Sequence, residues 1–179
     1  MVVGGTVFWM TYHEAVLDFE QAVEGLSSNT ILYDRAGLPF NTLNGIESRL
    51  IIPQEQIGRN LKISVLASED ARFFQHRGVD AFRLISAFWT NLRSGSYKEG
   101  ASTITQQLVK LTLLSPEKTL FRKFREIAIS ISLEMKFSKQ KILGYYLNTV
   151  YLGHGNFGIE QASLTYYKKH AENLTLAQA

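Results

Sequence analysis

Apolar residues recur at helical spacing along most of the chain. In residues 57–69, for example, Leu61 and Val65 fall on one face, which is the pattern of an amphipathic helix. The same pattern predicts helices at 11–26, 57–69, 80–93, 102–114, from Ser115-Pro116-Glu117 onward, at 139–152 and at 159–169. The fold class that follows is mainly α.

Between the first two of these helices the pattern changes. Thr30–Tyr33 and residues 49–52 are β-prone, and residues 34–37 (Asp-Arg-Ala-Gly) are a turn candidate. We therefore expect a minor β element near the N-terminus. Pro53 closes this region, and helical periodicity dominates after it.

The two ends of the chain suggest how it is organised. Residues 1–10 are apolar but far shorter than the ~20 residues that span a bilayer. We expect 1–26 to be an N-terminal segment, either the stub of a transmembrane anchor with a linker helix or a plain hydrophobic N-terminus. Residues 27–179 are expected to form one domain, apparently truncated because Leu-Ala-Gln-Ala ends it inside a helix-prone run.

Composition excludes several kinds of site. The 179 residues include no cysteine, which rules out disulfides, thiolate metal sites and a cysteine nucleophile. The four histidines lack metal-ligand spacing. The net charge of +3 tolerates phosphate, acidic lipid or nucleic acid as a partner without choosing among them. The G-x-G-x-x-G at 153–158 follows a helix rather than a strand, so we interpret it as a turn and not a dinucleotide site.

A charged strip runs along the helix that is predicted after residue 115. Lys118, Arg122 and Glu126 are spaced by four residues, so they share one face, opposite Phe121 and Phe124. Such a strip is usually a solvated helix face. Alternatively, arginine and lysine with a carboxylate at their end could form a phosphate clamp.

Two further polar groups invite a chemical interpretation. The run Ser102 to Gln107 is dense in neutral hydrogen-bonding side chains. It is either a surface helix with capping hydroxyls or a wall that holds a sugar or a phosphate. Glu69-Asp70 follows an apolar helix and precedes aromatic residues. That setting suits acid–base chemistry, although an acid pair at a helix end is at least as often structural.

Four blocks of sequence, in order, resemble one family. They are Glu69 to Gly78 (E-D-x-x-F-x-x-H-x-G), 100–110 (G-x-S-T-I-T-Q-Q-L-x-K), Arg122 to Glu126 (R-K-x-x-E) and Lys139 to Asn148 with Gly153 after it. This pattern resembles the peptidoglycan glycosyltransferases, the transglycosylase domain of class A penicillin-binding proteins and of monofunctional transglycosylases. The chain departs from the family at Leu111, where asparagine is frequent, and at Gly144, where glutamate is common.

The resemblance implies a fold, a reaction and a set of residues. The fold would be a lysozyme-like head lobe with a smaller, membrane-contacting jaw that includes 80–93. The reaction would polymerise lipid II into β-1,4-linked glycan with inversion and release of undecaprenyl pyrophosphate. The catalytic residues would be Glu69, as the base, and Glu126, near the leaving group. The residues that would bind the substrate are Ser102, Gln107, Lys110, Lys118 and Arg122.

The resemblance also implies partners and a location. These would be lipid II and the nascent glycan, the membrane surface, a C-terminal transpeptidase domain and cell-wall synthesis proteins, with no nucleic acid. The domain would work at the outer, periplasmic face of the bacterial cytoplasmic membrane. No cofactor would be obligatory, and a divalent cation (Mg or Mn) could sit near the pyrophosphate. The alternatives are a lysozyme-like glycan hydrolase and a non-catalytic module that binds lipid II.

Overall fold

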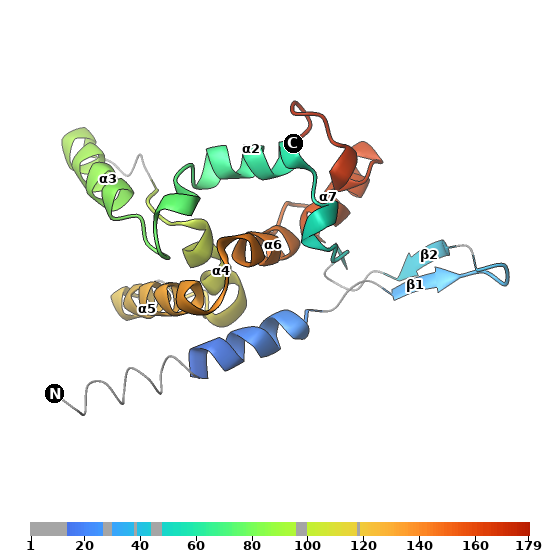
Figure 1. The fold of residues 1–179 in the computed structure, drawn as a ribbon, viewed down its shortest axis with the longest axis horizontal. Coiled ribbons are helices and arrows are strands. Elements are labelled where there is room, and N and C mark those ends of the chain that lie inside the picture. Colours follow the sequence, from blue (N-terminus) through green and yellow to red (C-terminus); the bar gives the residue numbers. More distant parts are fainter. Residues whose placement is uncertain (1–13, 27–29, 38, 44–47, 96–99, 118) are drawn as a thin grey trace.

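The computed structural model describes residues 14–26, 30–37, 39–43, 48–95, 100–117 and 119–179, and it is mainly helical, as predicted (Figure 1). Residues 14–24 are helical. The longer helices are α2 (Arg59–Glu69), α3 (Ala81–Ser94), α4 (Ile104–Leu113), α5 (Leu120–Lys136), α6 (Lys139–Thr149) and α7 (Ile159–Tyr167). The strands are β1 (Thr30–Tyr33), β2 (Pro39–Leu43), β3 (Ser48–Arg49) and β4 (Asn156–Phe157).

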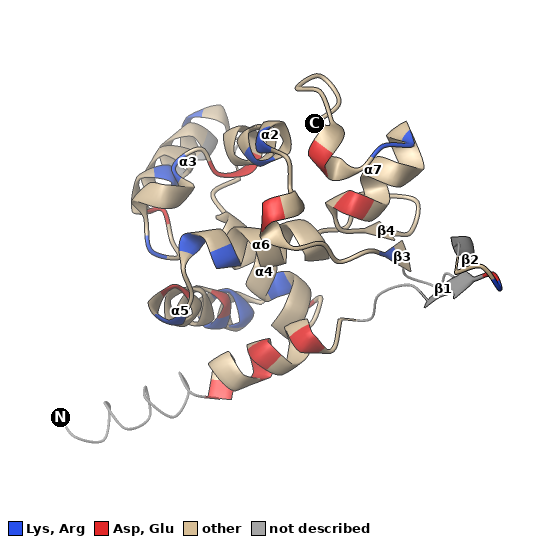
Figure 2. Ribbon diagram, turned by 45° about the vertical axis from the view of Figure 1, so that its right-hand side comes forward, with Lys and Arg blue, Asp and Glu red and all other residues tan. Residues whose placement is uncertain are grey.

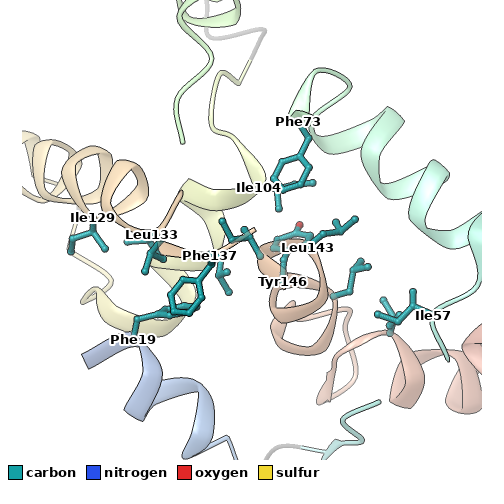
Figure 3. Close-up of a cluster of buried hydrophobic side chains, with 14 of the residues drawn as sticks. Phe19, Ile57, Phe73, Ile104, Ile129, Leu133, Phe137, Leu143 and Tyr146 are labelled. Carbon is teal, nitrogen blue, oxygen red and sulfur yellow. The ribbon is translucent and has the colours of Figure 1, made fainter. Parts of the chain in front are cut away.

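Helix α4 lies at the centre of the domain and packs against both α5 and α6. Its residues Ile104, Leu108 and Val109 are fully buried, together with Leu133 of α5 and Leu147 of α6. Figure 3 shows this cluster of apolar side chains between the helices. Because the hydrophobic effect drives such burial, the core fixes the position of α4.

The helical segment 14–24 belongs to the same core. The ring of Phe19 is fully buried, with its centroid 5.6 Å from that of Phe137 and 5.5 Å from that of Tyr145. Ala15 and Val16 are buried beside it. Residues 14–24, which we expected to precede the domain, therefore contribute to the packing of the domain core.

The β structure is only partly as predicted. β1 pairs with β2 in an antiparallel hairpin, whose turn has a hydrogen bond from Gly37 N to Asp34 O of 3.0 Å. Our expectation of a strand at 49–52 was wrong in extent, since β3 is Ser48–Arg49 and pairs in parallel with β4, more than 100 residues later. A strand partner so distant in sequence leaves no local signal.

The predicted start of α5 was wrong, and one of the two alternatives for its charged residues does not hold. The helix begins at Leu120 rather than at Ser115-Pro116-Glu117, because the Thr119 hydroxyl accepts the hydrogen bond from Arg122 N at 3.1 Å and caps it. The apolar side chains that share one face are exposed, with 78% for Phe121 and 70% for Phe124. Of the charged strip, Glu126 is buried and the Arg122 side chain is 17% exposed, so these two residues do not form a solvated face.

Helix α3 presents its apolar residues to solvent. Phe82 is 76% exposed, Ile85 60%, Trp89 54% and Leu92 60%. These four side chains therefore do not belong to the buried core. In the described residues, no helix combines the length and the apolar character that crossing a bilayer requires.

The N-terminus of α3 is fixed by Asp80. Its carboxylate accepts from Arg83 N at 3.0 Å, and it forms a two-point contact with the Arg72 guanidinium, in which Nε lies 2.9 Å from Oδ2. The hydrogen bond from Arg72 is the main reason that the pKa of Asp80 is lowered, and burial opposes it. The same contact raises the pKa of Arg72.

We expect Asp80→Asn to remove a contribution to the free energy of unfolding that the ionised Asp80 carboxylate makes and that acid abolishes. Because the folded pKa of Asp80 lies below its ordinary value of 3.8, its contribution is fully present above that pH. It is lost as the pH falls through the lowered folded pKa. Asparagine still caps a helix, so α3 should keep its start. Thermal unfolding at pH 7 and at several pH values below 4 should show a difference between variant and wild type that shrinks on acidification. A difference independent of pH would contradict this assignment.

Gly144 leaves room for a methyl group. It is buried in the middle of α6, and a Cβ there would meet the Gln54 side chain at 3.7 Å, an ordinary van der Waals distance. We expect Gly144→Ala to raise the free energy of unfolding by about 1 kcal/mol, since alanine is the better helix former. Chemical denaturation measures this, and Gly158→Ala is the opposite control. At Gly158, φ is 77° and a Cβ would lie 2.7 Å from Asn148 O, so that variant should be destabilised.

Candidate active site

Glu69 lines a broad hollow in the surface of the domain. Glu69 is the last residue of α2, and its Oε2 accepts a hydrogen bond from Gln107 Nε2 on α4 at 2.9 Å. The hollow encloses about 560 Å³, and we call it the Glu69 hollow. Its lining includes Glu69, Gln107, Tyr146, Tyr151, Tyr166 and Gln178. A carboxylate therefore faces a space of substrate size with polar and apolar walls.

Backbone contacts fix the end of α2. The N–H of Asp70 donates to Leu66 O at 3.0 Å and closes the last turn. The guanidinium of Arg83, on α3, donates to the backbone carbonyl of Glu69. The exposed helix α3 is thereby connected to the backbone of the candidate base, while the Glu69 carboxylate itself stays available to the hollow.

Asp70, the neighbour of Glu69, has a structural role. It is 1% exposed, and its Oδ2 accepts from Ile104 N, at the start of α4, at 3.1 Å. His76 Nε2 lies 3.0 Å from the same oxygen. Asp70 therefore satisfies an N–H at the first turn of α4, where a negative charge is favourable. The acid pair consists of one residue that faces the hollow and one that positions α4.

Gly78 completes this support. Its φ is 82°, and a Cβ there would lie 2.8 Å from the Ser130 backbone on α5. Its carbonyl accepts from the Thr103 hydroxyl at 2.6 Å. Only glycine allows this approach, so the first block of the sequence motif joins α2, α4 and α5.

The polar run 102–107 divides into two groups. Thr103 and Gln106 are buried and form a reciprocal capping box at the start of α4. Thr105 donates to Glu134 Oε1 at 2.5 Å. These three side chains therefore support the fold. The other two polar side chains reach the predicted catalytic residues. Gln107 contacts Glu69 directly, and Ser102 contacts Lys123, which in turn contacts Glu126.

A second cluster gathers cations around a buried carboxylate on α5, where Figure 2 shows basic and acidic residues together. Glu126 is 2% exposed, and its Oε2 lies 2.8 Å from Arg122 Nη1. Its Oε1 contacts Lys123 Nζ, which also lies 3.1 Å from Ser102 Oγ. We call Ser102, Arg122, Lys123 and Glu126 the basic cluster. A buried carboxylate with two cationic partners can orient them but has no oxygen free of a cation.

Lys110 and Lys118 are the remaining predicted substrate-binding residues. Lys110 is exposed in the last turn of α4. Lys118 lies outside the described residues. Sequence reasoning gave no role to Lys123, although its spacing of three from Glu126 is a helical ion-pair signal. It also gave none to Tyr146, whose hydroxyl lies 3.2 Å from Gln107 Oε1.

Helix α4 connects the two clusters. Ser102 precedes its capping residue Thr103, and Gln107 lies one turn into it. The Glu69 hollow therefore contacts α4 through Gln107, and the basic cluster contacts its start through Ser102. The arrangement offers a proton acceptor at one place and anion-binding cations at another, and both places adjoin α4.

The carboxylates and histidines of the described residues do not gather into a metal-binding group. Within the described residues, no three His, Cys, Asp or Glu side chains are grouped so that they could hold one. Both oxygens of Glu126 already contact cations. The described side chains therefore offer no metal site of three protein ligands.

Comparison with known proteins gives consistent matches. The family model described as Transglycosylase matches residues 37–179. Penicillin-binding protein 1A of Streptococcus pneumoniae (strain ATCC BAA-255 / R6) is 39% identical over 181 residues, which cover 99% of this chain and 25% of that protein. Penicillin-binding protein 2D of Bacillus subtilis (strain 168) is 41% identical over 151 residues, covering 84% of this chain and 22% of that protein.

A shorter relative matches as well. The biosynthetic peptidoglycan transglycosylase of Thiobacillus denitrificans (strain ATCC 25259 / T1) is 44% identical over 128 residues, covering 72% of this chain and 55% of that protein. The chain thus spans about a quarter of the length of the two penicillin-binding relatives and about half that of the third. The family model covers most of the chain, including all four sequence blocks. The chain therefore belongs to the transglycosylase family.

Proposed function

We propose that this chain is a peptidoglycan glycosyltransferase that joins lipid II units into β-1,4-linked glycan. The observation that carries the proposal is the Glu69 carboxylate at the edge of a hollow of about 560 Å³, held by Gln107. Family membership supports it, since one relative is named as a biosynthetic peptidoglycan transglycosylase. The donor is the growing chain on undecaprenyl pyrophosphate, and the acceptor is a new lipid II.

Glu69 acts as the general base. It takes the proton from the acceptor's 4-hydroxyl as that oxygen attacks the anomeric carbon of the donor, and the configuration inverts. A sugar hydroxyl is weakly acidic, so a positioned base contributes ~10²–10⁴-fold to the rate. The hydrogen bond from Gln107 supports this role because it fixes the orientation of the Glu69 carboxylate.

The basic cluster stabilises the leaving group. As the bond from the anomeric carbon to oxygen breaks, its electron pair departs with the pyrophosphate, and negative charge grows on the phosphate oxygens. Arg122 and Lys123 are cations that Glu126 holds in place before the reaction, which is the arrangement that electrostatic stabilisation requires. Lys110 and Lys118 remain predicted phosphate contacts. Glu126 is thus proposed as an orienting residue rather than a proton donor.

The contacts of Glu126 also argue against the glycan hydrolase. A glycosidase of that kind needs a second carboxyl group to act on the glycosidic bond. Glu126 is 2% exposed and its two oxygens contact Arg122 and Lys123. It is therefore poorly placed to work as that second carboxyl group. A neutral glycan also gives no reason for paired cations beside the site.

No step of this mechanism uses a divalent cation. The described side chains do not supply a ligand set for one. Mg or Mn carried by the pyrophosphate itself stays a prediction that only metal-dependent kinetics can test.

We further propose that α3 contacts the membrane that carries the lipid substrate. Its apolar residues Phe82, Ile85 and Trp89 are exposed, and such a face suits the bilayer interface. This would place the domain at the outer face of the bacterial cytoplasmic membrane. A transpeptidase domain and cell-wall synthesis partners remain predictions, consistent with relatives several times longer than this chain.

The test is incubation of the protein with fluorescent lipid II in detergent, followed by separation of the products by length. Long glycan that a muramidase digests is the expected result. Shortening of preformed glycan without synthesis would identify a hydrolase instead. Retention of lipid II without either reaction would identify a binding module.

A further inference from the structure

A buried tyrosine is connected to Glu69 through one glutamine. Tyr146, on α6, lies with its hydroxyl 3.2 Å from Gln107 Oε1, and Gln107 Nε2 donates to Glu69 Oε2 at 2.9 Å. Tyr146 is 3% exposed, and all three residues line the Glu69 hollow. Elements α2, α4 and α6 therefore meet in a single chain of hydrogen bonds.

The orientation of the Gln107 amide decides whether it helps Glu69. An amide has donor hydrogens on nitrogen and acceptor lone pairs on oxygen, and rotation of its last bond exchanges the two. In the turned orientation Oε1 would face Glu69 Oε2, and two acceptors would repel each other while Glu69 is ionised. The hydroxyl hydrogen of Tyr146 would also lose Oε1 as its acceptor. A buried polar group left without a partner is costly, so the observed orientation is favoured at both ends.

The Tyr146 hydroxyl is suited to remain a hydrogen-bond donor at all working pH values. Burial raises its pKa to about 12, and the negative charge of Glu69 is a second cause of the increase. The phenol therefore keeps its hydrogen throughout the pH range in which a bacterial enzyme works. An acceptor, Gln107 Oε1, lies within reach of that hydrogen.

We propose that Tyr146 is a positioning residue for the transfer reaction, which holds the Gln107 amide with its nitrogen toward Glu69. Gln107 then donates to Oε2, and among the described residues Oε1 of Glu69 has no hydrogen-bond donor. Oε1 is thus the oxygen that takes the proton of the acceptor hydroxyl. This inference rests on the proposed function of Glu69 as the base.

The test compares Tyr146→Phe with Tyr145→Phe. The two residues are neighbours on α6, and each variant removes one hydroxyl group. The Tyr145 ring, however, packs against Phe19 and Phe137, with ring centroids 5.5 Å and 6.0 Å apart, and it does not line the Glu69 hollow. With fluorescent lipid II in detergent, Tyr146→Phe should lower kcat about tenfold, a part of the ~10²–10⁴-fold that a positioned base contributes. Its KM should stay within about twofold, because Tyr146 acts on the base. Tyr145→Phe should change neither value by more than about twofold.

A double-mutant cycle separates positioning from a structural role. If Tyr146 acts through Gln107, Tyr146→Phe should change kcat by less than about twofold when Gln107→Ala is already present. The same tenfold loss in both backgrounds would overturn the proposal, and so would equal rates for Tyr146→Phe and Tyr145→Phe. Thermal unfolding confirms that each variant is folded.

Hydrogen exchange of the wild type gives a test that needs no variant. In protein labelled with ¹⁵N-glutamine, the side-chain amide hydrogens of Gln107 should exchange more slowly than those of the exposed Gln140. Equal exchange would mean that the amide is not held, and would contradict the proposal. A wild type that makes no glycan would refute the proposed function itself, and a fully active Glu69→Gln would refute the role of Glu69 as the base. An active wild type, an inactive Glu69→Gln and an unaffected Tyr146→Phe would refute only the positioning role.

Discussion

Glu69→Gln should lower the rate of glycan synthesis by ~10²–10⁴-fold while the fold stays intact. Glutamine has almost the same size as glutamate, and its carbonyl oxygen can accept the hydrogen bond from Gln107, but it cannot take up a proton. The contact of Arg83 with residue 69 involves the backbone carbonyl, which the substitution leaves in place. The measurement is the initial rate of polymer formation from fluorescent lipid II, together with thermal unfolding of both proteins.

The matched control for this variant is Glu55→Gln. Glu55 lies in a short 3₁₀ helix, Gln54–Gln56, and is exposed, so the same chemical change there should leave the rate within about twofold. Polymer made at an undiminished rate by Glu69→Gln would remove Glu69 from the mechanism. A large loss of melting temperature in Glu69→Gln would instead point to a structural role for the carboxylate.

Helical periodicity predicted most of the fold because the helices bury one stripe each. The segment 57–69 became α2, 102–114 became α4 and 139–152 became α6, each within a few residues. The parallel pairing of β3 with β4 could not be predicted, since it joins two-residue strands that are distant in the chain. Local patterns report local structure, and strands of this kind depend on tertiary packing.

The orientation of α5 shows where hydrophobic periodicity misleads. Phe121 and Phe124 form an apolar face, yet that face is exposed and the opposite face, with Glu126, is buried. Burial of a carboxylate is possible here because Arg122 and Lys123 neutralise it. Periodicity alone marks two faces and cannot say which faces inward when the charged one carries its own counterions.

The sequence indicated which residue types gather at the candidate site, but it could not say which contacts each residue makes. Glu69 and Asp70 are adjacent in sequence, and only the structure separates the residue at the hollow from the one that caps α4. Gln107 stays a predicted substrate contact, and the structure adds that its amide contacts Glu69 and Tyr146. Each of these roles depends on contacts between elements that are 30 or more residues apart.

The second large effect is expected for Glu126→Gln, which should lower the rate of polymer formation by about 10²-fold. The glutamine oxygen can accept from one cation, but its NH₂ group would face the other as a second donor. Arg122 or Lys123 would then turn away, and the leaving pyrophosphate would lose a cation that was positioned in advance. We also expect a loss of about 1–3 kcal/mol in the free energy of unfolding, less than for a fully buried pair because the Lys123 side chain is 35% exposed.

Glu134→Gln provides the comparison that separates these two effects. Glu134 lies on the same helix, its side chain is 3% exposed, and its carboxylate contacts Lys139 at 2.7 Å and accepts from Thr105 at 2.5 Å. It does not belong to the basic cluster. Both variants should therefore lose stability in denaturation experiments, but Glu134→Gln should keep most of its activity below its melting temperature. If the two variants lose activity in proportion to their stability, Glu126 supports the fold alone, and the leaving group must be stabilised by cations that Glu126 does not hold.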